Sequence, residues 1–245
     1  MKILYFIKLV ITDPKKFIFK VRNLFNYYFK LYFIKDIHLI EAKRWFRDKG
    51  DERLAFNYKL NQNSIVFDVG GYKGEFCEKI YSKFKCNIYV FEPHPLFFKA
   101  LKNKFNSNKK IKVFNYGLSD SNNEIQFYDQ ENGSSFYKIG NKTLLCKVKK
   151  FSSVFNENRI KKIDLIKINI EGGEYSLMDN IIENNLIDKI NHYQIQFHDF
   201  INDAVQKRAN IISLLKKTHE LKWCYKFVWE SWSKKSIKKI NSLEN

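Results

Sequence analysis

The chain has 245 residues, of which 44% are hydrophobic and 29% are charged. That length suits one α/β domain with an appendage, and the composition excludes a wholly disordered, collagen-like or low-complexity chain. No apolar run reaches the roughly 18 residues that a membrane span needs, because lysine interrupts every candidate.

Lysine and arginine total 44 against 26 acidic residues, which gives a formal charge of +18. Such a balance suits a nucleic acid or a membrane surface as partner, but the shared excess of Lys, Asn, Ile, Phe and Tyr is also what AT-rich codons encode. No RNP, KH or helix–turn–helix pattern is present, so a nucleic-acid partner is not expected. The four cysteines lack CxxC spacing and predict reduced thiols in a cytoplasmic protein.

Residues 1–60 predict a helical appendage. Asp13-Pro14 is a typical helix start, and a second helix is expected over Asp36–Asp48, ending at Gly50. The first helix has an aromatic face and a basic face. We expect it to form a lid over the acceptor site, a homodimer contact or a peripheral contact with the inner face of a membrane. The interspersed acids favour the lid or the dimer; they are Asp13, Asp36, Glu41 and Asp48.

From Ser64 onward, short apolar runs alternate with helical patterns, which predicts βαβ units in a mostly parallel sheet. Residues 61–230 would form this domain, and residues 231–245 a frayed basic tail. The expected strands are Ser64–Val69, Asn87–Phe91, Ile111–Tyr116, Asn123–Tyr128, Leu144–Lys149, Ile163–Asn169, Tyr193–Phe197 and Leu221–Trp229. The fourth and fifth of these would flank a turn at Gly133-Ser134-Ser135. The expected helices are Gly74–Phe84, Pro95–Asn106, Glu174–Asn184 and Asp203–Lys217.

Two motifs predict a cofactor that contains a nucleoside. The first is the stretch FDVGGYKGE from Phe67, in which a buried strand ends in a glycine turn that opens a helix. The second is Glu92-Pro93, at the end of the next strand, where an acidic residue can accept hydrogen bonds from ribose hydroxyls. The pattern GxGxxG is absent, so this spacing does not indicate a pyrophosphate.

The third motif is DLIKINIEGGEYSLM, which begins at Asp164 and includes most of another buried strand. Together with FDVGGYKGEF, YVFEPHPLFFKAL and NYGLSD, in that order, it resembles the FkbM family of S-adenosylmethionine-dependent methyltransferases. The resemblance implies an α/β class I methyltransferase (Rossmann-like) fold. That fold has a seven-stranded, mostly parallel sheet with one antiparallel strand near the edge.

The resemblance also implies which residues bind S-adenosylmethionine. The methionine end would lie against Asp68, Gly70, Gly71 and Gly74, and the ribose against Glu92 and Pro93. The adenine would be flanked by Gly117, Leu118, Ser119 and Asp120. For the last two of these residues, a plain polar turn is the alternative.

The chain departs from the family pattern at two places. Asn169 stands where an Asp is usual, and Phe151-Ser152 stands where Leu-Asp is usual. Because a divalent cation needs hard oxygen ligands, we expect no metal site. Asn169 can still orient a hydroxyl group through its amide.

His198 is the candidate general base. It follows a strand, and we expect the ends of three neighbouring strands to bring it close to Asp68, Asn169 and Glu171. Its ordinary pKa of about 6.5 suits removal of a proton from an acceptor hydroxyl group. A hydrogen-bonded structural histidine is the alternative, in which case Glu171 would be the next candidate.

The sequence therefore predicts an S-adenosylmethionine-dependent O-methyltransferase. By analogy, its acceptor is a sugar hydroxyl on a nucleotide- or lipid-linked intermediate of bacterial capsule or lipopolysaccharide synthesis. The alternatives are another acceptor, such as a phosphate derivative or a small natural product, and a non-catalytic basic protein that binds RNA or membranes on this fold.

Overall fold

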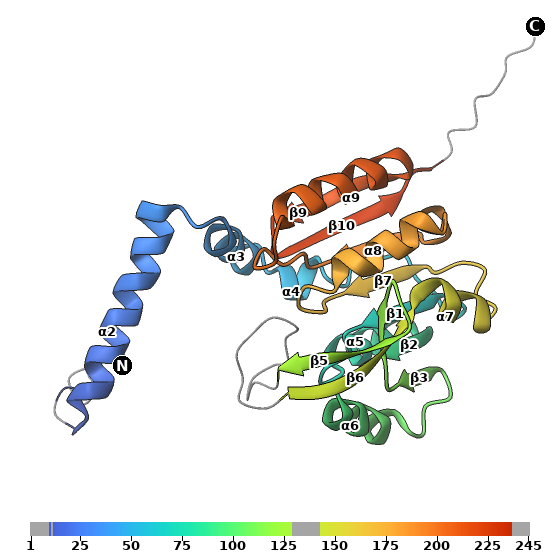
Figure 1. Ribbon diagram of the computed structural model, residues 1–245, viewed down its shortest axis with the longest axis horizontal. Coiled ribbons are helices and arrows are strands. Elements are labelled where there is room, and N and C mark those ends of the chain that lie inside the picture. Colours follow the sequence, from blue (N-terminus) through green and yellow to red (C-terminus); the bar gives the residue numbers. More distant parts are fainter. Residues whose placement is uncertain (1–9, 11, 129–142, 237–245) are drawn as a thin grey trace, which may run out of the picture.

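The computed structural model describes residues 10, 12–128 and 143–236. A seven-stranded sheet has the order β3-β2-β1-β7-β8-β10-β9 (Figure 1). All neighbours in it are parallel except β10, which is antiparallel to both β8 and β9. This arrangement confirms the predicted α/β class I methyltransferase fold. The strands are β1 (Ile65–Val69), β2 (Asn87–Phe91), β3 (Ile111–Phe114), β7 (Leu165–Ile168), β8 (His192–Ile195), β9 (His219–Tyr225) and β10 (Trp229–Lys234).

Helices cover both faces of this sheet because successive strand residues point to opposite sides. On one face, Val66 and Val90 pack with Cys77 of α5 (Glu75–Phe84) and Leu101 of α6 (Pro95–Phe105). The other face carries the larger core. Its helices are α7 (Phe151–Glu157), α8 (Glu174–Glu183) and α9 (Ala204–Thr218), and the short 3-10 helix η2 (Ile187–Lys189) follows α8.

A second, three-stranded sheet has the order β4-β6-β5. β5 (Asn123–Tyr128) and β6 (Thr143–Lys150) form the predicted antiparallel hairpin, and β4 (Gly117–Ser119) pairs with β6 in parallel. The predicted turn at Gly133-Ser134-Ser135 lies outside the described residues.

The prediction of a tail from Ser231 is wrong. The predicted last strand, Leu221–Trp229, is β9 followed by a turn, and a further strand, β10, runs from Trp229 to Lys234 with Trp232 only 1% exposed. Residues 230–233 read as polar, but their polar groups are paired inside the protein. Glu230 accepts a hydrogen bond from Arg208, and Ser231 is hydrogen-bonded to Tyr58. Buried polar residues of this kind break the apolar pattern by which a strand is recognised.

The N-terminal appendage has the predicted helices. It comprises α2 (Pro14–Phe29), the π-helical turn η1 (Lys30–Ile34), α3 (Ile37–Arg47) and α4 (Gly50–Arg53). Asp13 and Asp36 cap α2 and α3 through their carboxylates, as expected. Gly50 opens α4 rather than a loop.

Among the described residues of the appendage, those from α3 onward pack on the domain. The Trp45 ring of α3 lies 5.4 Å from that of Trp223 and 5.2 Å from that of Tyr225, both on β9. In contrast, α2 has no buried residue and stands apart from the domain (Figure 1). This helix therefore does not pack on the sheet as a lid would. Within the described ranges, no helix is both long and apolar enough to cross a bilayer.

Candidate active site

The glycine turn lies between β1 and α5. Gly70 has a φ of +84° and Gly74 a φ of +77°. Residues other than glycine rarely adopt this backbone conformation. A Cβ atom at Gly70 would lie 2.0 Å from the backbone oxygen of Asn169, which follows β7. The turn is therefore packed directly against the chain after β7. At Gly71, a Cβ would lie 2.3 Å from the side chain of Val90.

A buried ion pair lies beneath this turn. Asp68 of β1 and Lys167 of β7 are register neighbours, and Lys167 Nζ lies 2.9 Å from Asp68 Oδ1. The same ammonium donates a 2.6 Å hydrogen bond to the backbone oxygen of Gly70. Burial raises the pKa of Asp68, and the charge of Lys167 opposes that shift without cancelling it. Lys167 thus holds the end of β1 and the start of the glycine turn in place.

Glu92, at the end of β2, is also buried. Its carboxylate accepts hydrogen bonds from the backbone N–H of Tyr72, at 2.7 Å, and of His94, at 2.9 Å. Burial raises its pKa, and these two hydrogen bonds act in the opposite direction. Glu92 therefore joins the glycine turn to the start of α6. Its neighbour Pro93 lies next to Gly117, where a Cβ would be 3.5 Å from the proline Cγ.

The predicted adenine residues have different surroundings. Gly117 and Leu118 are buried in β4, and Leu118 belongs to the main hydrophobic core. Ser119 donates a hydrogen bond to Asp120, which is exposed. Gly117 lies beside Pro93, the neighbour of Glu92. Binding of adenine by these four residues stays a prediction.

His198 is held by Glu174, the first residue of α8. The carboxylate of Glu174 accepts the backbone N–H of His198 at 2.7 Å, and its Oε1 lies 3.0 Å from His198 Nδ1. Its second oxygen accepts the N–H of Gly172, and Tyr175 donates to the backbone oxygen of His198. Burial lowers the pKa of His198, but the hydrogen bond and charge of Glu174, together with the charges of Glu171 and Asp199, raise it above its ordinary value.

Glu171 completes this cluster. Its Oε2 lies 3.6 Å from His198 Nε2, and its side chain is 44% exposed. The backbone of Glu171 has a φ of +51°, an uncommon conformation for a residue with a side chain. This geometry directs the carboxylate toward the imidazole and leaves it accessible to a ligand.

Only part of the expected convergence is present. Glu171 and His198 meet, whereas Asp68 is turned to the opposite face of the sheet and pairs with Lys167. Asn169 lies against Gly70, and its Oδ1 is buried without a hydrogen-bond partner among the described residues. Of the expected convergence, the Glu171–His198 contact is present, and the approach of Asp68 and Asn169 to it stays a prediction. In β1, Phe67 and Val69 face the main core, which leaves Asp68 on the other side.

Two residues of this region were not anticipated. Lys167 interrupts an apolar strand, and its register opposite Asp68 was the available signal. Glu174 was read only as a helix start. Its carboxylate accepts two backbone N–H groups and contacts an imidazole. These contacts depend on the tertiary fold, so no local sequence pattern predicts them.

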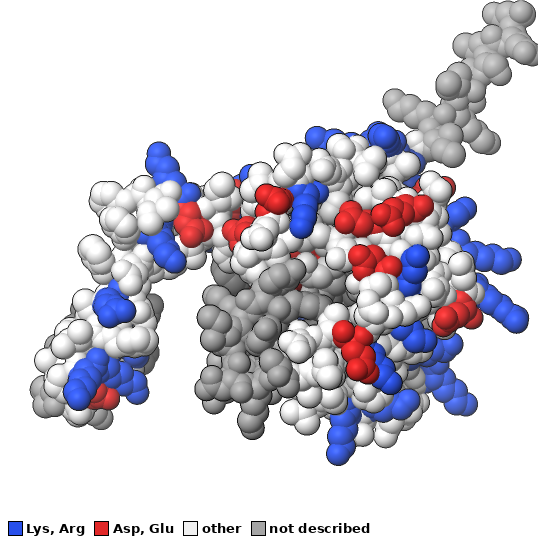
Figure 2. Space-filling view, viewed as in Figure 1, with Lys and Arg blue, Asp and Glu red and all other residues white. Residues whose placement is uncertain are grey.

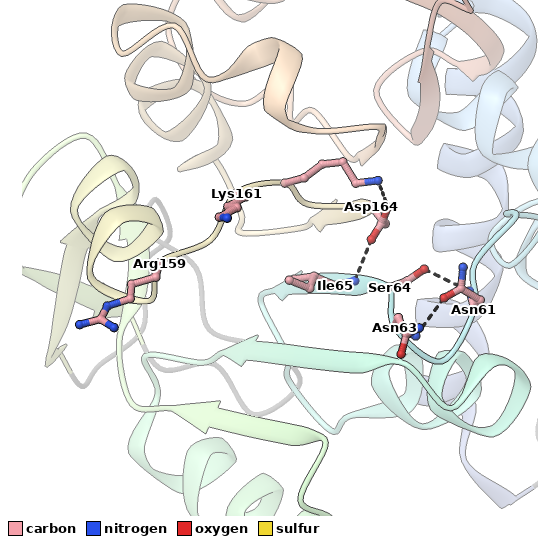
Figure 3. Close-up of a pocket in the computed structure, with 8 residues that line it drawn as sticks. Asn61, Asn63, Ser64, Ile65, Arg159, Lys161 and Asp164 are labelled. Carbon is pink, nitrogen blue, oxygen red and sulfur yellow. Dashed lines mark hydrogen bonds and ion pairs between the residues drawn. The ribbon is translucent and has the colours of Figure 1, made fainter.

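A polar groove lies at the other edge of the sheet (Figure 3). Ile65 begins β1 there, and its N–H donates to Asp164, which is also paired with Lys162. Since parallel strands have their carboxyl ends at one edge, this groove is remote from the glycine turn and from His198. We do not include it in the candidate active site.

The carboxylates of this site suit S-adenosylmethionine. Carboxylates end the adjacent strands β1 and β2, and Asp68 Oδ2 is buried without a hydrogen-bond partner among the described residues. The cofactor offers an ammonium group, a sulfonium and ribose hydroxyls, which are complementary to such acceptors. No other cofactor is needed to account for these groups.

Comparison with known proteins identifies the family. Residues 68–222 match the methyltransferase FkbM domain, and no curated protein matches the chain. Among solved structures, an rRNA methylase from Streptococcus thermophilus is similar at 13% identity and a TM-score of 0.44, covering 72% of this chain and 90% of that one. A fibrillarin/Nop5p complex gives 10% identity, a TM-score of 0.46 and coverages of 74% and 76%. TrmK of M. capricolum, in complex with S-adenosyl-homocysteine, is similar at 15% identity and a TM-score of 0.40. The match covers 72% of this chain and 65% of that one. Likenesses this distant carry no argument about the acceptor. The family match, which spans all the motifs of the site, shows that this chain belongs to the FkbM family of S-adenosylmethionine-dependent methyltransferases.

Proposed function

We propose that this methyltransferase acts on a hydroxyl oxygen and that His198 is its general base. The observation that carries the proposal is the Glu174–His198 pair, with a hydrogen-bonding distance of 3.0 Å at Nδ1. When Nδ1 carries a proton, it donates to Glu174, and the lone pair of the neutral imidazole is then at Nε2. An acceptor hydroxyl near Nε2 can give up its proton there.

Each neighbouring residue has a separate part in this proposal. Glu174 fixes the ring orientation and stabilises the imidazolium that forms. Glu171, beside Nε2, can accept a hydrogen bond from the acceptor and orient it. The amide oxygen of Asn169, which has no hydrogen-bond partner among the described residues, can also accept a hydrogen bond that orients the acceptor.

Cofactor binding would use the glycine turn and the two strand-end acids. Asp68 and Glu92 would bind the cationic and ribose parts of S-adenosylmethionine, respectively. The bound cofactor would supply an electrophilic methyl group, carried on a positively charged sulfur, for transfer to the acceptor oxygen. Gly70, Gly71 and Gly74 let this turn pack closely against Asn169, Val90 and Leu101, which fixes its backbone where the cofactor would bind.

The acceptor we propose is a sugar hydroxyl on a nucleotide- or lipid-linked intermediate of surface polysaccharide synthesis, in the cytoplasm. Phe200 supports a sugar, because its ring lies 5.2 Å from that of His198 and the residue is 46% exposed. An exposed ring beside the base offers an apolar surface for the C–H face of a pyranose. The phosphates of such an intermediate suit a chain with a charge of +18.

The test is a transfer assay with methyl-labelled S-adenosylmethionine, nucleotide sugars and lipid-linked glycan extracts. We expect label in a product that survives mild alkali, as a methyl ether does and a carboxylic methyl ester does not. The His198→Gln variant should give little product while binding the cofactor normally. Label on nitrogen or in an alkali-labile ester would refute hydroxyl transfer.

A further inference from the structure

We propose that α2 and η1 form a basic amphipathic helix that lies on the surface of an anionic membrane. The proposal is independent of the acceptor. It concerns the described part of the appendage before α3, in which α2 has no buried residue, and it names an anionic phospholipid surface as the partner.

The apolar face of α2 is continuous and exposed. At 100° per residue, six large side chains fall within an arc of about 140°. Their exposure runs from 43% to 67%, and they are Ile18, Val21, Leu24, Phe25, Tyr28 and Phe29. Phe25 and Phe29 stack along the helix with ring centroids 6.1 Å apart. A stripe of this kind in water indicates an interaction surface.

The charged residues on the opposite face are all basic, and they share that face with the exposed Phe19 and Tyr27. Lys15, Lys16, Lys20, Arg22 and Lys30 occupy the remaining arc, and no acidic residue occurs between Pro14 and Lys35. Figure 2 shows α2 as a largely uncharged surface with several basic groups on it and an acidic group at its lower end. Apolar side chains bordered by lysine and arginine are the pattern of helices that lie in an anionic lipid interface.

The acidic residues that argued against a membrane contact are accounted for by the structure. Asp13 and Asp36 accept backbone N–H groups as caps. Glu41 pairs with Arg44, and Asp48 accepts from Tyr225 and pairs with Arg47. All four lie outside α2 and η1, so the positive charge of the helix is uninterrupted.

The other two occupants fit the charges less well. A second copy of α2 on the apolar face would leave the basic residues of both helices without an opposite charge, whereas the phosphates of an anionic membrane would supply one. A lid would bury part of the helix on its own domain, and α2 has no buried residue. Trp45 fixes α3 on β9, and the left-handed turn at Lys35 separates α3 from η1 and α2 (Figure 1). The domain would thus be held close to the lipid surface.

The test is sedimentation of the full-length protein with vesicles of phosphatidylcholine that contain about 30% phosphatidylglycerol, compared with phosphatidylcholine alone. We expect binding to be at least about ten-fold stronger on the anionic vesicles. The double variant Phe25→Ser/Phe29→Ser, which leaves the charge unchanged, should lose at least about ten-fold in binding. The matched control Asn23→Ser/Asn26→Ser changes the polar face and should bind as the natural chain does.

Three results would overturn the proposal: no binding to anionic vesicles, equal binding to both vesicle types, or equal loss in the two double variants. A dimer in sedimentation equilibrium that only the phenylalanine variant abolishes, without vesicle binding, would assign the face to a second copy. The phenylalanine variant should still transfer methyl groups to a water-soluble acceptor. Failure of the membrane proposal is therefore separable from failure of the proposed function.

Discussion

Two buried acid–base pairs lie under the carboxyl edge of the sheet. They differ in whether the nitrogen atoms of the basic residue are all engaged inside the protein. In the first, the ammonium of Lys167 is engaged by Asp68 and by backbone oxygens of the glycine turn. In the second, Glu174 binds one nitrogen of His198, while the other nitrogen faces the half-exposed Glu171. Similar chemical groups thus hold a cation inside the protein in one place and, in the other, orient the imidazole that we propose as the general base.

The largest effect should come from removing the free nitrogen of the second pair. In His198→Gln we expect turnover to fall by about 10²–10⁴, or about 3–5 kcal/mol in the barrier, because the proton acceptor is lost. The affinity for S-adenosylmethionine, measured by calorimetry, should stay nearly constant. His38→Gln, on α3, is the control and should retain full turnover. If His198→Gln kept most of the activity, both pairs would be structural.

Removing the cation of the first pair should damage stability instead of chemistry alone. Lys167→Met leaves Asp68 buried without its partner, so we expect a loss of about 3–5 kcal/mol in the free energy of unfolding. Denaturant titration measures this loss. Adding Asp68→Asn should restore most of the stability, because no uncompensated charge remains. A double variant as unstable as the single one would show that the pair does not act as a unit.

The glycine turn that Lys167 supports gives a third test. Gly70→Ala places a Cβ 2.0 Å from a backbone oxygen at a φ of +84°. We expect a loss of about 2–3 kcal/mol in unfolding free energy. Gly117→Ala is the control, since its nearest neighbour would be 3.3 Å away. Equal stability of the two variants, measured by thermal unfolding, would contradict the close packing of the two loops.

The smallest effect concerns the pH dependence that Glu174 imposes on His198. Turnover should rise with pH as the imidazole loses its proton, with a midpoint above the ordinary value of 6.5, because Glu174, Glu171 and Asp199 together outweigh burial. In Glu174→Gln the midpoint should move to lower pH, with a loss of about ten-fold in turnover at the optimum. The pH profile of turnover measures both. A midpoint that does not move would show that Glu174 has no electrostatic effect on the base.

Stability should follow the opposite trend with pH at the same residue. The pKa of His198 is raised in the folded state, so its contribution is complete below the unfolded value of 6.5. That contribution is lost as pH rises through the folded pKa.

The sequence predicted the βα units and the location of the site, because glycine turns and strand-end acids are local patterns. It did not predict Lys167 or Glu174 as site residues, since their roles depend on partners 99 and 24 residues away. It also missed β10, whose buried Glu230 and Ser231 look like surface residues until Arg208 and Tyr58 are placed beside them.

The position of β10 has a consequence for how the chain is made. The last strand in sequence is not at the edge of the sheet but is inserted between β8 and β9. Its Ser231 is hydrogen-bonded to Tyr58, which precedes the first strand. During synthesis, β9 therefore has no neighbour in the sheet until residues 229–234 leave the ribosome. A message truncated just before Trp229 would yield a chain with two unpaired strand edges, β8 and β9, and such edges are prone to aggregation.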